Sequence, residues 1–330
     1  MLPARDIARA AGDALVHAAA RCGLLLASLL PPRVAYLLAA GAGDVLYAVS
    51  LRRRRIALRN LDIAFRCELT RGEKRHIARR SFRHAMAHLS GMALRGRWAR
   101  EGSLERLFAI SVEEDQLLRA PSARGVAFLG GHVGDWEMTQ HYLGLRGIPV
   151  AVVTRAVSSP GLDRVIVRLR SERGGRVIAK RGALRDVRAT LRAGGAVGIL
   201  ADQNCPRRER FFEFFGVPAS TYTEHASVLA RSGCRILFVA CVREGFRFRF
   251  RVHVRDLGRD LPAFPGVTER ERRRLRTDEV VRRYLAALED LIRRSPEQHF
   301  WMHRRWKSRP TGTPWLYHDL GEPLEPSLLG

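Results

Sequence analysis

The sequence predicts an α/β protein in which a mostly parallel central sheet is flanked by helices, with an apolar helical segment at the N-terminus. The first observation is that short segments rich in Val, Ile and Ala alternate with helical segments of about 10 to 15 residues, the pattern of βαβ units. The second is that 46% of the 330 residues are hydrophobic, which provides for a large buried core. Strands are expected at residues 125–130, 149–156, 176–180, 196–204 and 235–244, and helices at 161–175 and 183–195.

Capping residues and side-chain alternation predict three further elements. Thr70 and Glu73 have the spacing of a capping box, which indicates a helix that leads into the sheet. Phe or Val alternates with Arg across residues 246–254, as expected for a strand near a sheet edge with one face in water. A late helix is expected to begin at Thr277, because two acidic residues would then lie in its first turn, and to end before Pro296.

The N-terminal region is predicted to associate with a membrane. Residues 14–30 and 34–49 are largely apolar, although neither range is an uninterrupted run of about 20 apolar residues such as a transmembrane helix needs. The arginines at 52–55 follow and favour the cytoplasmic side of a membrane. We therefore expect a membrane-associating helical segment at 1–58 and a larger domain, which would carry any catalytic site, at 59–330. A cleaved signal peptide and ordinary core helices are the two alternatives.

The charge of the chain implies an anionic partner. Fifty-eight Lys and Arg residues against 33 Asp and Glu give a formal net charge of +25. Nucleic acid, an anionic membrane, a phosphorylated substrate or an acidic carrier protein would each fit, and so would a basic, solvated surface without a specific partner. The arginines are spread through the expected helices and no nucleic-acid-binding module is recognisable, so nucleic acid is not the expected partner.

Several other kinds of site are disfavoured. Five scattered cysteines without a C-x-x-C pair argue against a disulfide framework and a structural zinc site. His84 and His88 have the spacing of two zinc ligands on one helix face, but no nearby carboxylate or cysteine completes the set, so no metal site is expected. The sequence contains no Walker A, dinucleotide-binding or G-x-S-x-G motif.

One stretch combines the residue types of a catalytic site. In GGHVGDWE, residues 130–137, two glycines allow a sharp turn, and His132 comes directly after an expected strand. Asp202 follows the apolar part, AVGIL, of a later strand, and ligands of open α/β sheets bind beyond the carboxyl ends of the strands. A histidine there can act as a general base if a carboxylate orients its ring. Spacing alone leaves Asp135, Glu137 and Asp202 open as that carboxylate.

Several motifs, in the same order, resemble the late acyltransferases of lipid A biosynthesis, which belong to the glycerolipid-acyltransferase-like superfamily. The motifs are GGHVGDWE, ILADQN, FFGVPASTYTEHASVLAR and HFWMHRRWKSRP, and the similarity begins earlier, at NLDIAF. The superfamily is defined by a His followed, after four residues, by Asp or Glu. The resemblance implies that His132 is the general base and Glu137 its motif partner, with Asp202 as a rival partner and Asp135 ranked below Glu137.

The resemblance also implies contacts with the substrates. Two arginines match basic positions of the family and would hold phosphate or a phosphopantetheine. A Phe and a Thr of the motif FFGVPASTYTEHASVLAR would form a wall of the acyl channel. An arginine among the aromatic rings of HFWMHRRWKSRP suits the boundary between lipid and headgroup. Solvated helix faces and plain core packing are the competing explanations. The expected substrate-binding residues are Arg155, Arg170, Gln203, Phe215, Thr221 and Arg305.

The function implied by the resemblance is that of a membrane-associated O-acyltransferase. It would move a fatty acyl chain from acyl carrier protein (acyl-ACP) or coenzyme A (acyl-CoA) to a hydroxyl of a lipid A precursor or related glycolipid. No cofactor or metal is expected, because a thioester is already an activated electrophile. The expected partners are acyl carrier protein, the lipid acceptor and anionic inner-membrane lipids, and the expected location is the cytoplasmic face of the bacterial inner membrane, with an N-terminal anchor. A lysophospholipid, an aminolipid or a phosphatidylinositol mannoside stays open as acceptor, and a basic nucleic-acid- or membrane-binding protein without catalysis is the distant alternative.

Overall fold

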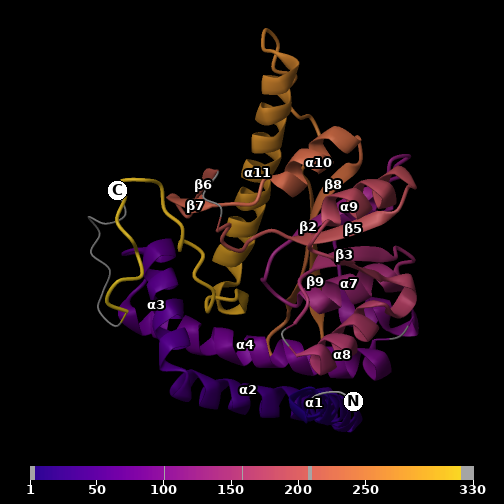
Figure 1. Cartoon of the computed structure of the whole chain (residues 1–330), viewed down its shortest axis with the longest axis vertical. Helices are drawn as coiled ribbons and strands as arrows, with labels where there is room; N and C mark the ends of the chain where they lie inside the picture. The colour runs from indigo at the N-terminus through magenta and orange to yellow at the C-terminus, as the bar shows by residue number, and fades with distance from the viewer. Residues whose placement is uncertain (1–3, 100, 158, 207–209, 321–330) are drawn as a thin grey trace.

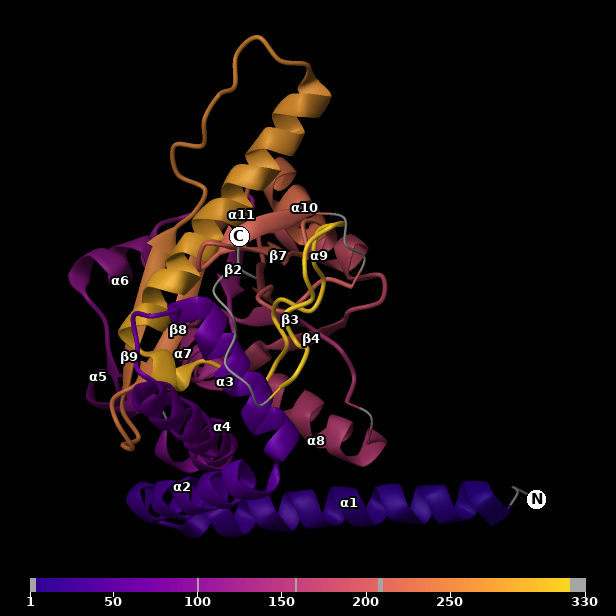
Figure 2. The same ribbon diagram turned by 90° about the vertical axis from the view of Figure 1, so that its left-hand side faces the viewer.

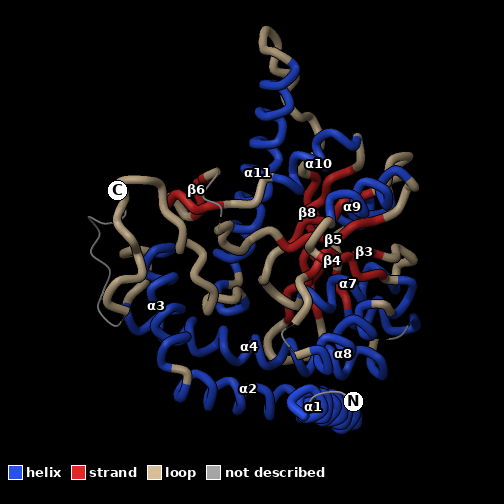
Figure 3. Tube along the Cα trace, in the orientation of Figure 1, coloured by secondary structure: helices blue, strands red, loops and turns tan. Residues whose placement is uncertain are grey.

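A computed structural model of the chain describes residues 4–99, 101–157, 159–206 and 210–320. Its strands are β1 (Phe108–Ala109), β2 (Val126–Gly130), β3 (Val150–Thr154), β4 (Arg176–Ala179), β5 (Ala196–Leu200), β6 (Phe211–Phe214), β7 (Val217–Ser220), β8 (Arg235–Arg243) and β9 (Phe250–Asp256). Among the described residues, seven strands form one sheet in the order β1-β9-β8-β2-β5-β3-β4, and β6 pairs with β7 in a separate hairpin. Figures 1 and 3 show helices on both sides of this sheet.

Helices α1 to α5 precede the first strand, the later helices alternate with strands, and together they cover both sheet faces. They are α1 (Ala4–Leu29), α2 (Pro32–Val49), α3 (Leu51–Phe65), α4 (Arg71–Trp98), α5 (Leu104–Leu107), α6 (Val112–Arg119), α7 (Trp136–Leu145), α8 (Pro160–Arg170), α9 (Ala183–Arg192), α10 (Glu224–Ser232) and α11 (Glu269–Arg294). Three short 3₁₀ turns within the described residues are η1 (Glu101–Ser103), η2 (Glu172–Gly174) and η3 (Pro296–Gln298).

The sheet confirms the predicted fold class. Strands β8, β2, β5, β3 and β4 run parallel to one another, whereas β9 runs antiparallel to β8. Strand β9 lies one strand from the edge and alternates buried with more exposed side chains, as its sequence predicts. It begins at Phe250, not at residue 246, because the preceding residues form the turn from β8, closed by a hydrogen bond from the Glu244 N–H to the Arg249 carbonyl (2.9 Å).

Both faces of the central strands are buried, which explains their continuous apolar runs. Along β2, Ala127 and Leu129 belong to one core cluster and Phe128 to the other. The first cluster includes residues of α3, α9, α10 and α11, and the second includes residues of α2, α4, α6 and α7. The sheet is therefore the middle layer between two sets of helices, and its strand ends are the places where side chains can reach a ligand.

Two of the three helix boundaries read from capping signals are confirmed. Thr70 caps α4 with the full capping box that its spacing with Glu73 predicts. The late helix also ends as predicted, just before Pro296. Its predicted start was wrong, because α11 begins eight residues earlier, where the Thr268 hydroxyl accepts the Glu271 N–H (3.3 Å). Thr277 lies inside α11, and its hydroxyl donates to the carbonyl one turn back.

Helices α1 and α2 form the base of the molecule. Figure 2 shows them below α4 and α8, against which they pack. Helix α1 contains one 18-residue window, 12–29, that is long and apolar enough to cross a membrane, whereas α2 and α3 meet at a bend of 93°. The predicted boundary at residue 58 falls inside α3, without a break in the helix. The exposed large apolar side chains of α1 and α2 are Val16, Leu25, Leu26, Leu29, Val34, Leu37, Leu38, Val45, Leu46 and Val49.

Candidate active site

The register of two neighbouring strands brings His132 and Asp202 together. Gly130, the last residue of β2, lies opposite Leu200, the last residue of β5. His132 and Asp202 each follow two residues later, so they leave the sheet side by side at its carboxyl edge. Gly131 permits this approach, because a Cβ at that position would lie 2.7 Å from a methyl group of Leu288 and 3.4 Å from the Asp202 carboxyl carbon.

Asp202 holds His132 by two hydrogen bonds. Its Oδ2 accepts the His132 backbone N–H (2.7 Å), and its Oδ1 lies 2.7 Å from the ring Nδ1. The Asp202 side chain is 3% exposed and the histidine side chain 21% exposed. Burial acts to lower the pKa of His132, but the adjacent carboxylate outweighs it and raises that pKa; the imidazolium likewise lowers the pKa of Asp202 against the effect of its burial. The bond at Nδ1 leaves Nε2 as the nitrogen that can accept a proton.

Glu137 makes a different pair from the one its motif position predicts. It lies in the first turn of α7, and its carboxylate, 3% exposed, accepts two hydrogen bonds from Arg170 of α8 (Nη2 to Oε1, 2.5 Å; Nε to Oε1, 3.0 Å). Arg170 also donates to the Thr154 hydroxyl at the end of β3 (2.8 Å). The carboxylate on the ring of His132 is therefore that of Asp202, because the strand register fixes Asp202 there while the start of α7 turns Glu137 toward α8.

The loop at residues 299–306, which follows η3, packs over the histidine. The Phe300 N–H donates to the His132 carbonyl (2.9 Å), and His299 forms an antiparallel bridge with Val133. His303 accepts the Asn204 N–H at its Nε2 (3.1 Å). Burial lowers the pKa of both His299 and His303 to about 4, so both rings are neutral at pH 7. The single histidine of this group with a raised pKa is thus the one paired with Asp202.

Asn60 anchors that loop from α3. Its Nδ2 donates to the carbonyls of Trp301 (2.6 Å) and His303 (2.7 Å), and its Oδ1 accepts the Tyr317 hydroxyl (2.5 Å). Asn60 is 1% exposed, so each of these bonds satisfies a group that is removed from water. These contacts join an early segment, NLDIAF, to a late one, HFWMHRRWKSRP.

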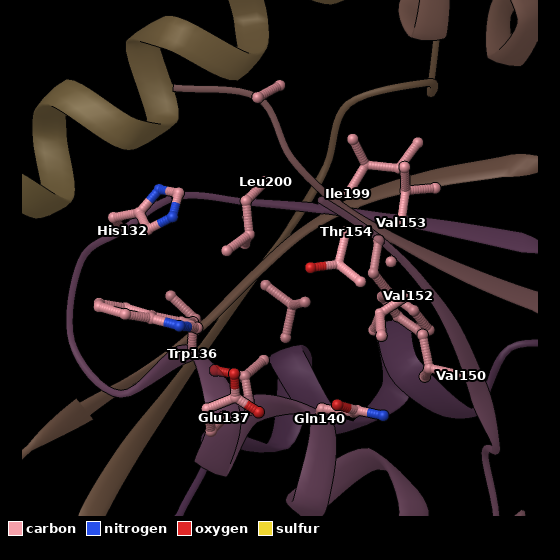
Figure 4. A pocket seen from close by; sticks show the side chains of 18 of the residues that line it. His132, Trp136, Glu137, Gln140, Val150, Val152, Val153, Thr154, Ile199 and Leu200 are labelled. Carbon is pink, nitrogen blue, oxygen red and sulfur yellow. The ribbon is translucent and has the colours of Figure 1, made fainter. Parts of the chain in front are cut away.

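A pocket of about 330 Å³ extends from His132 along the sheet. Figure 4 shows His132 and Trp136 at one end and Val150 and Val152 at the other. Apolar side chains of the strands and polar side chains, several of them from α7 and α8, both line the pocket. The volume is within the usual range for small-molecule sites, about 300–1,000 Å³. An apolar chain can therefore lie in the pocket with its polar end at the histidine.

The predicted substrate-binding residues are placed in three different ways. Arg155, Arg170 and Gln203 line the pocket. Thr221 and Arg305 lie outside this lining, and Arg305 Nη2 donates a hydrogen bond to Thr221 Oγ1 (2.7 Å). Arg305 lines a separate, small cavity together with Asp202 and His132.

Phe215 belongs to a buried aromatic cluster away from the pocket. Its ring centroid is 5.5 Å from that of Phe65 and 6.3 Å from that of Trp301. Core packing, the competing explanation for this residue, therefore describes its position. The neighbouring hairpin of β6 and β7 places Phe215 at its turn, where the Glu289 carboxylate accepts its backbone N–H (2.8 Å).

Four further side chains that line the pocket were not among the predicted site residues. Trp136 stands edge-on to the His132 ring (centroids 5.0 Å apart). The Lys180 ammonium lies 4.2 Å from the centre of the Tyr222 ring, and His225 follows at the start of α10. Trp136 lies within the motif GGHVGDWE, and Tyr222 and His225 lie within FFGVPASTYTEHASVLAR, so the motifs could have indicated all three. Lys180 follows β4 outside these motifs, and no local pattern indicates its approach to the pocket.

Asp135 is the centre of a buried polar network behind the site. Its carboxylate accepts the Met138 N–H as the cap of α7, lies 2.9 Å from the His88 Nδ1, and accepts a hydrogen bond from Arg243 (2.6 Å). Arg243 also contacts the His84 ring (3.3 Å). These two histidines of α4 therefore belong to an ion-pair network, and no group of side chains able to hold a metal is found in the described part of the chain.

A mostly parallel sheet flanked by helices, with a pocket beyond the carboxyl ends of its strands, is consistent with an α/β acyltransferase fold. A family model described as "Bacterial lipid A biosynthesis acyltransferase" matches residues 5–308. The chain belongs to this family, as its motifs predict, and it is an O-acyltransferase.

Curated relatives match most of the chain. A lipid A biosynthesis palmitoleoyltransferase of Escherichia coli (strain K12) is 29% identical over 271 residues, which are 81% of this chain and 82% of the relative. A lipid A biosynthesis acyltransferase of Shigella flexneri shows the same identity and coverage. A lipid A biosynthesis lauroyltransferase of E. coli (strain K12) is 26% identical over 300 residues, 89% of this chain and 92% of the relative.

Proposed function

We propose that the protein transfers a fatty acyl chain from a thioester, acyl-ACP or acyl-CoA, to a hydroxyl of a lipid A precursor or related glycolipid at the membrane surface. The observation that carries the proposal is the His132–Asp202 pair at the mouth of an apolar pocket. Membership of the lipid A acyltransferase family supports the acceptor, and the names of the relatives support a fatty acyl group as the cargo.

In the proposed reaction, Nε2 of His132 removes the proton of the acceptor hydroxyl while Asp202 stabilises the imidazolium that forms. The hydroxyl oxygen attacks the thioester carbonyl carbon, the new C–O bond forms and the C–S bond breaks. The thiolate leaves with the proton that His132 received, so the histidine returns to its neutral form. Asp202 keeps its charge throughout, because its pKa lies below its ordinary value.

The pocket suits the acyl chain of the donor. Val150 and Val152 form part of the lining remote from His132, and burial of a methylene group there contributes about 0.8 kcal/mol. Arg155 and Lys180 place positive charge beside the same pocket, where a phosphate of the carrier's phosphopantetheine or of the acceptor would bind. Glu137 neutralises Arg170, so we assign Arg170 to the pocket wall and not to phosphate binding.

Helices α1 and α2 are proposed to lie at the cytoplasmic face of the inner membrane. Their exposed leucines and valines form an apolar surface of the kind that marks a membrane contact. The basic run at 52–55 begins α3 directly beside this surface, where anionic headgroups would attract it. The net charge of +25 would serve a second partner as well, the acidic acyl carrier protein.

The test is mass spectrometry of lipid products. Detergent-solubilised protein is incubated with acyl carrier protein thioesters and a phosphorylated glucosamine-disaccharide lipid, beside the His132→Ala variant and a His76→Ala control on the exposed part of α4. We expect a species heavier by one acyl group with the wild type and the control, and none with His132→Ala. If the thioester is consumed with total membrane lipids but not with the disaccharide lipid, and this consumption needs His132, the acceptor is another lipid. Consumption that does not depend on His132 would contradict the mechanism.

The salt dependence of turnover tests whether acyl carrier protein docks on the basic surface. Because exposed charges are screened within about 8 Å at physiological ionic strength, turnover with acyl carrier protein should fall more steeply with added salt than turnover with a small acyl thioester. Equal salt sensitivity of the two donors would contradict docking through the basic surface.

A further inference from the structure

A second cavity, separate from the catalytic pocket, lies where α1 crosses α4 and α8. It measures about 610 Å³, and we call it the α1–α4–α8 cleft. Its apolar wall includes Leu24 of α1, Met92 of α4 and Val165 of α8. The cleft and the catalytic pocket share no lining residue in the part of the chain that the structure describes. It is thus a separate site, with a size in the range of ligand-binding cavities.

Close contacts between α1 and α8 shape the cleft. The His17 ring lies 3.0 Å from the Gly161 carbonyl, and a Cβ on Gly161 would lie 2.3 Å from the Asp13 carbonyl oxygen. The two helices touch at this crossing, and toward the C-terminal end of α1 the space between α1, α4 and α8 opens into the cleft. Figure 2 shows α1 at the base of the molecule, below α4 and α8.

The cleft carries an excess of positive charge. Arg21 and Arg168 line it, and Arg95 lies at its base with a side chain that is 2% exposed. The Arg95 guanidinium donates to the Leu169 carbonyl and lies 3.4 Å from the Glu172 carboxylate, while its Nε, buried, has no partner. Glu172 is the acidic residue among those lining the cleft, so the positive charges outnumber it.

The cleft is also continuous with the apolar base. Leu25 and Leu29 line it and are 61% and 65% exposed, so they belong at the same time to the surface proposed to contact the membrane. An acyl chain could pass from the membrane into the cleft along these side chains without crossing water, and its headgroup phosphate would meet the arginines. Apolar walls, basic residues and continuity with a membrane surface are the features expected for a bound phospholipid with a negative charge.

We propose that the α1–α4–α8 cleft binds one anionic phospholipid of the surrounding membrane, with an acyl chain along the apolar wall and the phosphate between Arg21 and Arg168. The bound lipid would hold α1 against α8. The last residue of α8, Arg170, lines the catalytic pocket. The inference rests on the proposed membrane association and is independent of the proposed chemistry.

Native mass spectrometry of the full chain in detergent, titrated with phosphatidylglycerol or with phosphatidylcholine, tests the site. We expect one retained phosphatidylglycerol at concentrations where phosphatidylcholine is not retained. Arg168→Gln should weaken retention about fivefold, the effect of one charge near an anionic headgroup. The matched control is Arg164→Gln, an exposed arginine of the same helix that does not line the cleft. Equal retention of the two lipids, or equal effects of the two substitutions, would overturn the proposal.

A steric pair of variants gives a second readout. Ser28 lines the cleft, and its hydroxyl bonds within its own helix, to the Leu25 carbonyl (2.6 Å), so Ser28→Trp should fill the space and abolish retention. Leu26→Trp places the same ring on the exposed side of α1 outside the cleft and should leave retention unchanged. Retention by Ser28→Trp would overturn the proposal. The His132→Ala variant should retain the lipid while losing acyl transfer, which distinguishes failure of the site from failure of the proposed reaction.

Discussion

The carboxylate of Asp202 bonds to both the backbone N–H and the ring Nδ1 of His132, so one side chain fixes the position and the orientation of the histidine. Both contacts follow from the pairing of Gly130 with Leu200. The orienting carboxylate therefore comes from a strand that is distant in sequence and adjacent in the sheet.

Replacing Asp202 by Asn should lower kcat by about 10²–10⁴-fold, because the amide can still accept the backbone N–H but does not stabilise a protonated ring. Single-turnover transfer from an acyl thioester measures the effect, with the melting temperature as the control for folding. Unchanged kcat in a folded Asp202→Asn variant would show that the pair does not serve proton transfer.

The pH dependence of kcat/KM should reflect the raised pKa of His132. A histidine with a raised pKa stays protonated to higher pH and cannot accept a proton there, so the acidic limb should lie above the ordinary value of 6.5. Asp202→Asn should move this limb to lower pH, since the carboxylate is what raises the pKa. A limb at or below 6.5 in the wild type would contradict the assignment.

Glu137→Gln should leave the acidic limb nearly where it is in the wild type, since the Glu137 carboxylate bonds to Arg170 and not to the ring of His132. A double-mutant cycle with Arg170→Gln should give a coupling free energy of about 1–3 kcal/mol in denaturant unfolding. A shift of the limb as large as that caused by Asp202→Asn would restore Glu137 as the partner of His132.

Asp135→Asn should destabilise the fold by about 3–5 kcal/mol, because it leaves the fully buried guanidinium of Arg243 without its carboxylate. Denaturant unfolding measures the loss. The control is Asp186→Asn, whose carboxylate is 47% exposed and whose loss should change the stability by less than about 0.5 kcal/mol. Equal stability of the two variants would show that the network contributes little.

The strand pattern and the place of His132 could be predicted because they depend on local sequence. Short apolar runs define β2 and β5, and His132 and Asp202 follow these two runs. The choice between Glu137 and Asp202 could not be made in the same way. It depends on which strands are neighbours, and on the packing of α8 against α7 that gives Glu137 its own arginine.

Two other residues show the same dependence on tertiary contacts. Thr277 has acidic residues after it, as a cap would, but the earlier Thr268 caps the helix and nothing between the two interrupts it. Phe215 lies in an apolar stretch that fits a channel wall as well as a core, and only its contacts with Phe65 and Trp301 decide between them. In both cases the local composition fits either interpretation equally well, and only the tertiary structure distinguishes them.

The anchoring of the loop at 299–306 by Asn60 affects how the enzyme matures during translation. The helix that carries Asn60 leaves the ribosome long before the loop that it holds, and chains acquire structure from the N-terminal side as they are synthesised. The sheet and its histidine can thus form while the Phe300 contact to the His132 carbonyl is still missing. The site is therefore complete only when the loop at 299–306 has been synthesised and has docked on Asn60.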